Sequence, residues 1–148
     1  MKVIFVKQKI GYTNGVFDLL HTGHIDFFKQ CKEYCDFLIV AVCPDEMVLH
    51  YKGKLPIIPF EERKKMLDHI DLINMVVDQT SVNRIEEWNK YKFNVYFHGE
   101  DGYEFDIKFG NYDQLIKHGI KVIYFPRDTS RSTTNIIKKI LDYYQNDK

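Results

Sequence analysis

Residues 10–31 read IGYTNGVFDLLHTGHIDFFKQC, and they contain the clearest structural signal in the chain. An apolar run at 10–13 is typical of a β-strand, whereas 23–34 places its aromatic and cysteine side chains on one stripe, as an amphipathic helix does. A polar loop with several glycines and histidines joins the two. A strand that leads through a short loop into a helix is the first half of a strand–helix–strand unit with a parallel sheet.

The same alternation extends over the rest of the chain. Further short apolar runs, each typical of a strand, lie at 3–6, 37–42, 75–77, 95–97 and 122–125. Further helical periodicity is found at 60–70, 82–91, 112–118 and 133–144. The pattern predicts an α/β fold with a Rossmann-like, doubly wound parallel sheet in a single domain over 1–148, in which 1–9 is an N-terminal extension without an assigned role. In the last helix we expect the buried side to consist of Ile136, Ile137, Ile140, Leu141 and Tyr144.

Composition narrows the possible functions. Of the 148 residues, 45% are hydrophobic and 28% are charged, which excludes a disordered or fibrous chain. The 21 basic and 21 acidic residues cancel, whereas a nucleic-acid-binding protein usually carries a basic excess, so we expect no nucleic-acid partner. The longest apolar run, 37–42, is far shorter than the ~20 residues of a membrane span. Three cysteines in apolar surroundings are typical of a reducing compartment, and we therefore expect a cytoplasmic protein.

The loop at 15–24 carries the first set of chemically active side chains. In a doubly wound sheet, ligands bind where loops leave the carboxyl ends of the strands, and this loop leaves the first such end. His21 and His24 are three residues apart at the expected helix start, so both imidazoles can lie on one face. Gly23 between them lets a ligand approach the backbone closely. Because a helix start already attracts phosphate, two added histidines suit charge that builds up on a phosphorus atom.

A second polar loop spans 127–134, between the last expected strand and the last helix. Arg127 offers a planar guanidinium donor. The hydroxyl groups of Ser132, Thr133 and Thr134 stand at the helix start, where side chains and free amides can cradle a polyphosphate. This loop also leaves a strand at its carboxyl end, so it is expected to face the same site as the histidines.

Lys52 and Lys54 lie in a polar connection after the strand at 37–42 and can reach over the phosphates. Each of these features also has an ordinary explanation. Lysines in a connection are usually solvated, a Ser-Thr-Thr sequence is usually a helix cap, and histidines at a helix start are usually capping or surface residues. Their occurrence together, in order, at the predicted carboxyl ends of strands favours a phosphate-binding site.

These residues closely resemble those of the cytidylyltransferase family, a branch of the HxGH nucleotidyltransferases that acts on glycerol 3-phosphate, choline phosphate and ethanolamine phosphate. His21-Thr-Gly-His24 corresponds to the HxGH motif, and Arg127 followed by Ser132-Thr133-Thr134 corresponds to the family signature RTEGISTT. The sequences FEER at 60–63 and HGED at 98–101 also match family segments. The resemblance runs from about residue 10 to residue 141, which is nearly the whole chain.

The resemblance implies an enzyme that transfers CMP from CTP to a phosphorylated alcohol, releases pyrophosphate, needs Mg²⁺ and forms a homodimer. It implies that the catalytic residues are His21, His24, Lys54 and Arg127. It implies that the nucleotide is bound by Val16, Phe17, His21, His24, Lys54, Asp101, Arg127, Asp128, Thr129, Ser130, Arg131, Ser132, Thr133 and Thr134. The acceptor phosphate would be held by Lys52 and Arg84, and Asp18 and Arg63 look like supporting residues. Mg²⁺ would be carried by CTP without a direct protein ligand, and Asp18 is the one candidate contact.

Several departures from the family pattern leave the acceptor open. Asp71 and Asn74 stand where glycerol-phosphate enzymes carry Arg and Asp, and Gly102 stands where they carry Trp. The His98-Gly pair resembles the choline and ethanolamine branch instead. Glycerol 3-phosphate is the first acceptor we expect, followed closely by other polyol phosphates, phosphoethanolamine and phosphocholine. The alternatives are adenylyl transfer to FMN or a sugar phosphate on the same scaffold, and a nucleotide-binding sensor without turnover.

Arg131 is the strongest departure within the 127–134 loop, because an aliphatic residue is usual at this position. Two interpretations remain open. The side chain points to solvent and is without consequence, as exposed loop substitutions usually are. Alternatively, it adds a donor to the polyphosphate cradle, or it pairs with Asp128 and braces the loop.

Overall fold

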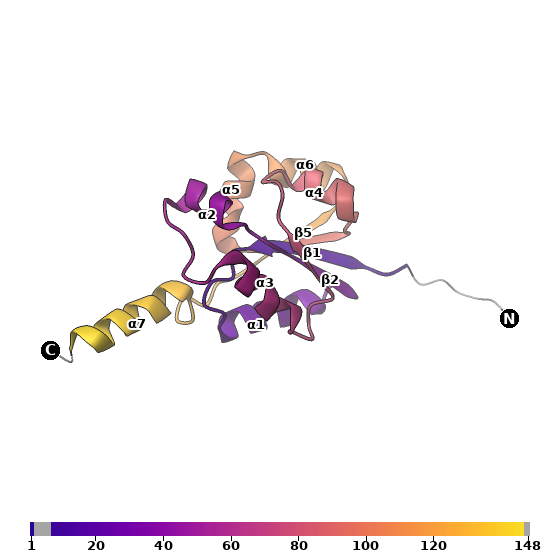
Figure 1. The fold of residues 1–148 in the computed structure, drawn as a ribbon. Coiled ribbons are helices and arrows are strands. Elements are labelled where there is room, and N and C mark those ends of the chain that lie inside the picture. The colour runs from indigo at the N-terminus through magenta and orange to yellow at the C-terminus, as the bar shows by residue number, and fades with distance from the viewer. Residues whose placement is uncertain (2–6, 147–148) are drawn as a thin grey trace.

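The structure is a computed structural model that describes Met1 and residues 7–146. Its centre is a five-stranded sheet in which every paired strand is parallel, in the order β3-β2-β1-β4-β5 (Figure 1). The strands are β1 (Ile10–Gly15), β2 (Phe37–Val42), β3 (Met75–Asp78), β4 (Val95–Gly99) and β5 (Lys121–Phe125). The predicted doubly wound parallel sheet is therefore confirmed. The strand expected at 3–6 lies outside the described residues.

Helices cover both faces of this sheet. They are α1 (Thr22–Lys32), α2 (Asp45–Lys52), α3 (Phe60–Asp68), α4 (Arg84–Tyr91), α5 (Tyr103–Lys108), α6 (Asn111–Lys117) and α7 (Thr133–Gln145), with a short 3₁₀ helix, η1 (Glu100–Gly102). Figure 1 shows α1 and α3 on one face of the sheet, and α4, α5 and α6 on the other. The chain first winds outward from β1 to β3, then crosses over and winds outward again through β4 and β5. The strand order thus reverses between β1 and β4, which is where a fold of this kind binds its ligands.

Two apolar clusters fill the space between the sheet and its helices. On the α1 and α3 side, Phe28 and Leu67 pack against alternate residues of β2 and β4. On the α4 and α6 side, Tyr12 stacks on Phe93 with ring centroids 4.7 Å apart. Successive strand residues enter opposite clusters, as the two-residue period of a strand requires. The thiols of all three cysteines are free and buried, as expected for small core residues.

Helix α2 corrects the prediction of a polar connection for Lys52, whereas Lys54 lies in the connection that follows the helix. Lys52 is the last residue of α2, and Gly53 ends the helix in the left-handed conformation, with φ of 68°. Glycine adopts this conformation without a steric cost, and it is a common way to end a helix. The sequence contains the signals, since a proline precedes two acidic residues at 44–46. A helix of eight residues with one buried side chain, Val48, has little periodicity to detect.

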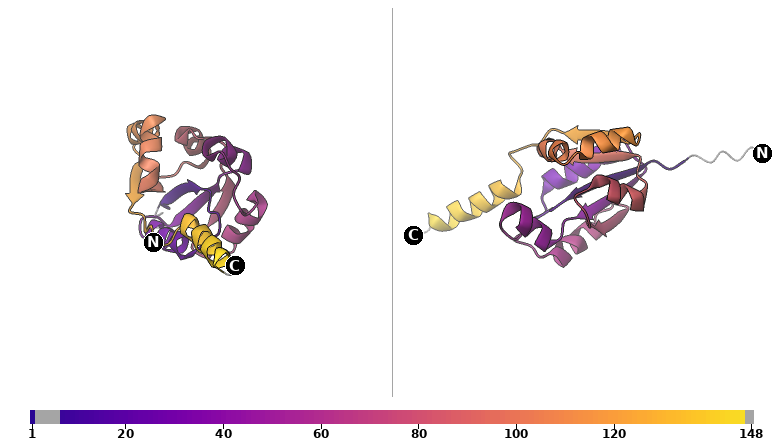
Figure 2. Two further views of the ribbon diagram at one scale, coloured as in Figure 1. Left: turned by 90° about the vertical axis from the view of Figure 1, so that its left-hand side faces the viewer. Right: turned by 90° about the horizontal axis from the view of Figure 1, so that it is seen from above.

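Helix α7 corrects the prediction of a buried apolar side. The helix extends away from the body of the protein (Figure 1, Figure 2), and none of its residues is classed as buried. Ile140, Leu141 and Tyr144 are 47%, 54% and 68% exposed, whereas Ile136 and Ile137 near its start are partly buried. Helical spacing reveals that an apolar stripe exists, but it carries no information about what covers that stripe. Among the described residues, no helix is long and apolar enough to cross a membrane.

Candidate active site

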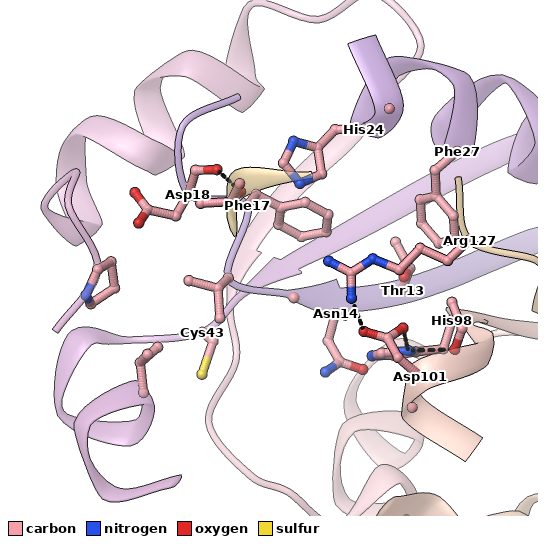
Figure 3. Close-up of a pocket in the computed structure, with 18 of the residues that line it drawn as sticks. Thr13, Asn14, Phe17, Asp18, His24, Phe27, Cys43, His98, Asp101 and Arg127 are labelled. Carbon is pink, nitrogen blue, oxygen red and sulfur yellow. Dashed lines mark hydrogen bonds and ion pairs between the residues drawn. The ribbon is translucent and has the colours of Figure 1, made fainter. Parts of the chain in front are cut away.

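A cavity of about 700 Å³ opens at the carboxyl ends of the strands, where the strand order reverses between β1 and β4. Its walls come from the end of β1, the loop into α1, the end of α2, the segment before α4, the end of β4 and the loop after β5. Figure 3 shows side chains from these distant segments around one space. The cavity has the size of a small-molecule site, and it lies where the sequence predicted one.

His21 and His24 form the cap of helix α1. His21 is the N-cap residue, and its Nδ1 accepts a hydrogen bond from the backbone N–H of Gly23 at 3.1 Å. In return, the Nδ1 of His24 accepts from the backbone N–H of His21 at 3.3 Å. The two rings stack with their centroids 3.9 Å apart. This is the reciprocal geometry of a capping box, with histidines in place of the usual Ser or Thr and Glu.

These two hydrogen bonds determine where each neutral ring carries its proton. An Nδ1 that accepts from an N–H is unprotonated, so the proton is on Nε2. Burial, together with the charges of His21 and Arg127, lowers the pKa of His24 to about 4. Burial and the charges of Arg127 and Arg131 also lower the pKa of His21. Near neutral pH the site therefore offers two neutral Nε2–H donors, and neither has a partner among the described residues.

The loop from β1 to α1 is held in an unusual shape. Phe17 and Leu19 have φ of 53° and 47°, in the left-handed region that side chains other than glycine rarely adopt. The carboxylate of Asp18 between them accepts from the backbone N–H groups of Ile57 (2.7 Å) and Ile58 (2.9 Å). Both carboxylate oxygens are used in this way, so Asp18 braces the loop, and a contact from Asp18 to Mg²⁺ remains a prediction.

Val16 and Phe17 were expected to offer their backbone to the nucleotide, and both line the cavity. The carbonyl of Val16 accepts a hydrogen bond of 2.6 Å from Nη1 of Arg63. Arg63 is thus a supporting residue, as the resemblance implies, because it fixes the loop from beneath. The backbone group of Val16 that remains available to a ligand is its N–H.

Arg127 and Asp101 lie across the cavity from the histidines and pair with each other (Figure 3). Nη1 of Arg127 donates to Asp101 at 2.7 Å, and the backbone N–H of Arg127 donates to Glu100 at 3.1 Å. Both side chains of the Arg127–Asp101 pair are about half exposed, so the pair is weak and exchangeable. A phosphate can therefore replace the carboxylate as the partner of Arg127.

The rest of the 127–134 loop joins the start of α7 to the first loop. Ser132 is the N-cap of α7 and accepts from the backbone N–H of Asn135 at 3.2 Å. The hydroxyl of Thr133 donates to the carbonyl of Asp18 at 2.7 Å. The starts of α1 and α7 therefore border the same cavity, and the positive ends of both helix dipoles suit phosphate.

Arg84 lines the opposite side of the cavity, at the start of α4. Its side chain is almost fully buried; Nε donates to the hydroxyl of Tyr96 at 3.1 Å and lies 3.4 Å from the carboxylate of Asp106. Its Nη1 has no hydrogen-bond partner in the part of the chain that the structure describes. A buried donor without a partner costs about 1–3 kcal/mol, so an anionic ligand beside Arg84 would relieve this cost. His98 lies nearby, and burial and the charge of Arg84 lower its pKa.

The structure brings most of the predicted residues together. The cavity is lined by Val16, Phe17, Asp18, His21, His24, Lys52, Lys54, Arg84, Asp101, Arg127, Asp128, Arg131, Thr133 and Thr134. Thr129, Ser130 and Ser132 do not line it; they shape the loop instead, and Ser130 donates to Asp128 from both its backbone N–H and its hydroxyl.

Sequence reasoning missed the residues that form the floor and the α4 side of the cavity. These are Thr13, Asn14, Tyr51, Gln79 and Phe105. Asn14 and Gln79 share a hydrogen bond of 3.3 Å, and Asn14 also accepts from the hydroxyl of Tyr96 at 3.2 Å. The signal that could have found them is polar residues at the end of a strand that is otherwise apolar, since β1 ends in Thr-Asn-Gly.

The fold and the site agree with the nucleotidyltransferase class that the resemblance implies. The agreement lies in the histidines that cap α1, the arginine and hydroxyl loop at 127–134, and the doubly wound sheet. Residues 12–142 match the family described as Cytidylyltransferase-like, and the chain belongs to this family. It is 36% identical over 136 residues to "FAD synthase" of Pyrococcus abyssi, covering 88% of this chain and 90% of that protein. It is 35% identical over 141 residues to "Bifunctional protein HldE" of Geobacter sulfurreducens, but spans 28% of that protein's length.

Solved structures agree with the fold. The lipopolysaccharide core biosynthesis protein of Thermoplasma volcanium superimposes with a TM-score of 0.66 at 23% identity, over 82% of this chain and 98% of that one. A pantoate-beta-alanine ligase of Francisella tularensis superimposes with a TM-score of 0.59 at 17% identity, over 88% of this chain and 62% of that one. At these identities the likeness concerns the fold alone.

Proposed function

We propose that this nucleotidyltransferase moves CMP from CTP to the phosphate of a phosphorylated alcohol, with glycerol 3-phosphate as the first candidate acceptor. The observation that carries the proposal is the pair of Nε2–H donors on His21 and His24 opposite Arg127, in a cavity whose other side holds Arg84 with an unused N–H. In this proposal, one side of the cavity holds the triphosphate and the other side holds the second phosphate. Such a division suits a reaction between two phosphorylated substrates.

In the proposed reaction, an oxygen of the acceptor phosphate attacks the α-phosphorus of CTP. The new P–O bond forms as the bond from the α-phosphorus to the bridging oxygen breaks, and pyrophosphate leaves on the opposite side. His21 and His24 donate hydrogen bonds to the charge that develops on the phosphate oxygens, and Lys54 and Arg127 neutralise the leaving pyrophosphate. Arg84 and Lys52 hold the acceptor, so that positioning and charge stabilisation replace a covalent intermediate.

In the proposed reaction, Mg²⁺ would enter the site bound to the triphosphate. The cavity carboxylates are already engaged: Asp18 with backbone amides, Asp101 with Arg127, and Asp26 and Asp128 with Arg131. Within residues 7–146 no group of three or more acidic, histidine or cysteine side chains is arranged to hold a metal ion. We expect the nucleotide phosphates to supply the ligands, and the bound ion would withdraw charge from the triphosphate.

Adenylyl transfer to FMN or a sugar phosphate is the second candidate. It is favoured by the FAD synthase of Pyrococcus abyssi, which the chain matches over 90% of that protein's length. Both reactions use the same phosphate chemistry, so they differ in the base and in the acceptor.

A panel assay of pyrophosphate release separates the two. CTP, ATP, GTP and UTP are combined with glycerol 3-phosphate, phosphoethanolamine, phosphocholine, FMN and a sugar phosphate, with and without Mg²⁺. We expect the highest rate with CTP, an alcohol phosphate and Mg²⁺. A faster reaction of ATP with FMN or a sugar phosphate would overturn the proposal, and CTP binding without any turnover would support the sensor instead.

A further inference from the structure

Arg131 connects two rims of the cavity that are far apart in the sequence. Its Nη1 donates to the carboxylate of Asp26 on α1 at 2.5 Å, and its Nε donates to Asp128 within its own loop at 2.8 Å. Asp26 and Arg131 both line the cavity. The side chains of this pair are 38% and 44% exposed, so the contact lies at the mouth of the site and not in the core.

The backbone of the same residue also touches α1. The carbonyl oxygen of Arg131 lies 2.9 Å from the position that a Cβ at Gly23 would occupy. A side chain at residue 23 would therefore collide with the loop, and glycine is what lets the loop lie directly on the first turn of α1. Arg131 thus meets α1 at two points: its guanidinium pairs with Asp26, and its carbonyl lies against Gly23.

Hydrogen bonds connect Arg131 to the rest of its loop and the loop to the first turn of α7. Asp128 accepts from the backbone N–H of Ser130 at 3.0 Å as well as from Arg131, and the side chain of Asn135 donates to the carbonyl of Thr129 at 2.5 Å. Hydrogen bonds from Ser130 and the guanidinium of Arg131 lower the pKa of Asp128 to about 2. Asp128 is therefore ionised throughout the neutral range and keeps its partners.

Two functions are open to such an arginine, and the geometry distinguishes them. A direct phosphate donor needs free N–H groups and an excess of positive charge beside the ligand. Arg131 instead already has two carboxylate partners, so its positive charge is balanced by Asp26 and Asp128. Two carboxylate partners leave Arg131 fewer N–H groups for a triphosphate than the single partner Asp101 leaves Arg127, and the pair with Asp26 joins the loop to α1.

We propose that Arg131 and Asp26 form a clasp that holds the 127–134 loop on helix α1 and so positions Arg127, Thr133 and Thr134 for the nucleotide. Asp26 and Arg131 are positioning residues in this proposal, since they act through the loop. The attachment of the loop is a property of the unliganded protein, whereas its benefit for nucleotide binding rests on the proposed function. The two parts are tested by separate measurements.

Amide hydrogen exchange of the unliganded protein tests the attachment. Asp26→Asn and Arg131→Gln each remove the ion pair with little change in size, and Lys29→Ala is the matched control. Lys29 is the other cation beside Asp26, at 3.8 Å, but it contacts the helix and not the loop. We expect faster exchange in residues 127–134 for both clasp variants, and wild-type exchange for Lys29→Ala. Wild-type exchange in both clasp variants would overturn the proposal.

Calorimetric titration with CTP and with ATP tests the consequence for binding. In each clasp variant, the Kd of the preferred nucleotide should rise by about two- to fivefold, as expected for the loss of one exposed ion pair. The double variant should be no weaker than Arg131→Gln alone, because both substitutions remove the same contact between Asp26 and Arg131, and the KM of the nucleotide should rise more than kcat falls. Tighter binding by Asp26→Asn would mean that Arg131 is a direct phosphate donor, and additive losses would mean that the two residues act separately; either result overturns the clasp. If the wild type binds no nucleoside triphosphate, the proposed function fails, while the exchange measurement still decides the attachment.

Discussion

Arg63 and Val16 are joined by a hydrogen bond of 2.6 Å between a buried guanidinium on α3 and a backbone carbonyl in the loop that leads to α1. The same guanidinium donates to the carbonyls of Ile58 (2.9 Å) and Cys43 (3.0 Å). One side chain thus ties together three segments at the carboxyl edge of the sheet. The strained backbone at Phe17 and Leu19 persists because such contacts hold it.

Replacing Arg63 should therefore destabilise the whole edge of the sheet. Arg63→Met leaves three carbonyls without their donor and Asp45 without its cation, so we expect a loss of about 3–5 kcal/mol in the free energy of unfolding. Urea denaturation measures this loss. Lys64→Met is the matched control, because Lys64 pairs with Asp78 at the surface and should contribute less than about 1 kcal/mol. Equal effects of the two substitutions would refute the role of Arg63.

Removal of either capping histidine should affect catalysis more than binding. His21→Ala and His24→Ala each delete an Nε2–H donor that acts on developing charge, so kcat should fall by about 10²- to 10³-fold. Nucleotide affinity should change much less, because the donors act most strongly in the transition state. Steady-state rates and calorimetry measure the two effects. His69→Ala is the control: His69 lies at the end of α3, where its ring contacts the carbonyl of Lys65. An unchanged kcat in either active-site variant would contradict the assignment.

The lowered pKa of His24 predicts a pH-dependent stability. The folded state keeps His24 neutral down to about pH 4, whereas the unfolded chain protonates it below its ordinary value of 6.5. The unfolded state thus binds more protons between these values, and the free energy of unfolding falls as the pH falls from 6.5 to 4. In His24→Gln this fall should be smaller by up to about 3 kcal/mol. Urea denaturation of both proteins at several pH values measures the difference, and parallel curves would show that His24 is not the group responsible.

Substitution of Lys52 and substitution of Lys54 should each change the KM of a different substrate. Lys52→Ala is expected to raise the KM of the acceptor more than that of CTP, whereas Lys54→Ala should have the opposite preference, since the resemblance assigns them to different phosphates. Both side chains are exposed and line the same cavity, so each variant is the control for the other. Equal effects of Lys52→Ala on both substrates would place Lys52 at the triphosphate.

The sequence predicts those parts of the fold for which the residues of one short segment are sufficient evidence. Strand β2 was predicted with its observed bounds, because a short run of six consecutive apolar residues is typical of a strand that is covered on both faces. The two site loops were located because the carboxyl ends of parallel strands meet at one edge. No local rule reveals that α7 leaves the body of the protein, or that Asp26 meets Arg131, because both depend on how distant segments pack.

Candidate residues were also missed where the local pattern resembles core structure. Thr13 and Asn14 belong to a strand that is buried along most of its length, so their position at the floor of the cavity follows only from where the strand ends. Gln79 lies one residue beyond β3, and its position in the cavity likewise follows only from where that strand ends. The histidines were correctly located, but their reciprocal capping bonds, and hence the position of the proton on Nε2, required coordinates.

The position of β1 at the centre of the sheet has a consequence for the order of folding. β1 pairs on one side with β2, the next strand along the chain, and on the other with β4, where Gly11 meets Val95. During synthesis the first of these strands leaves the ribosome early, and one of its edges has no native partner until β4 has been made. An open strand edge in an incomplete sheet is a site of misassembly, and pairing between distant strands is slow. The length of the segment from β2 to β4 therefore sets how long that edge stays unpaired during synthesis.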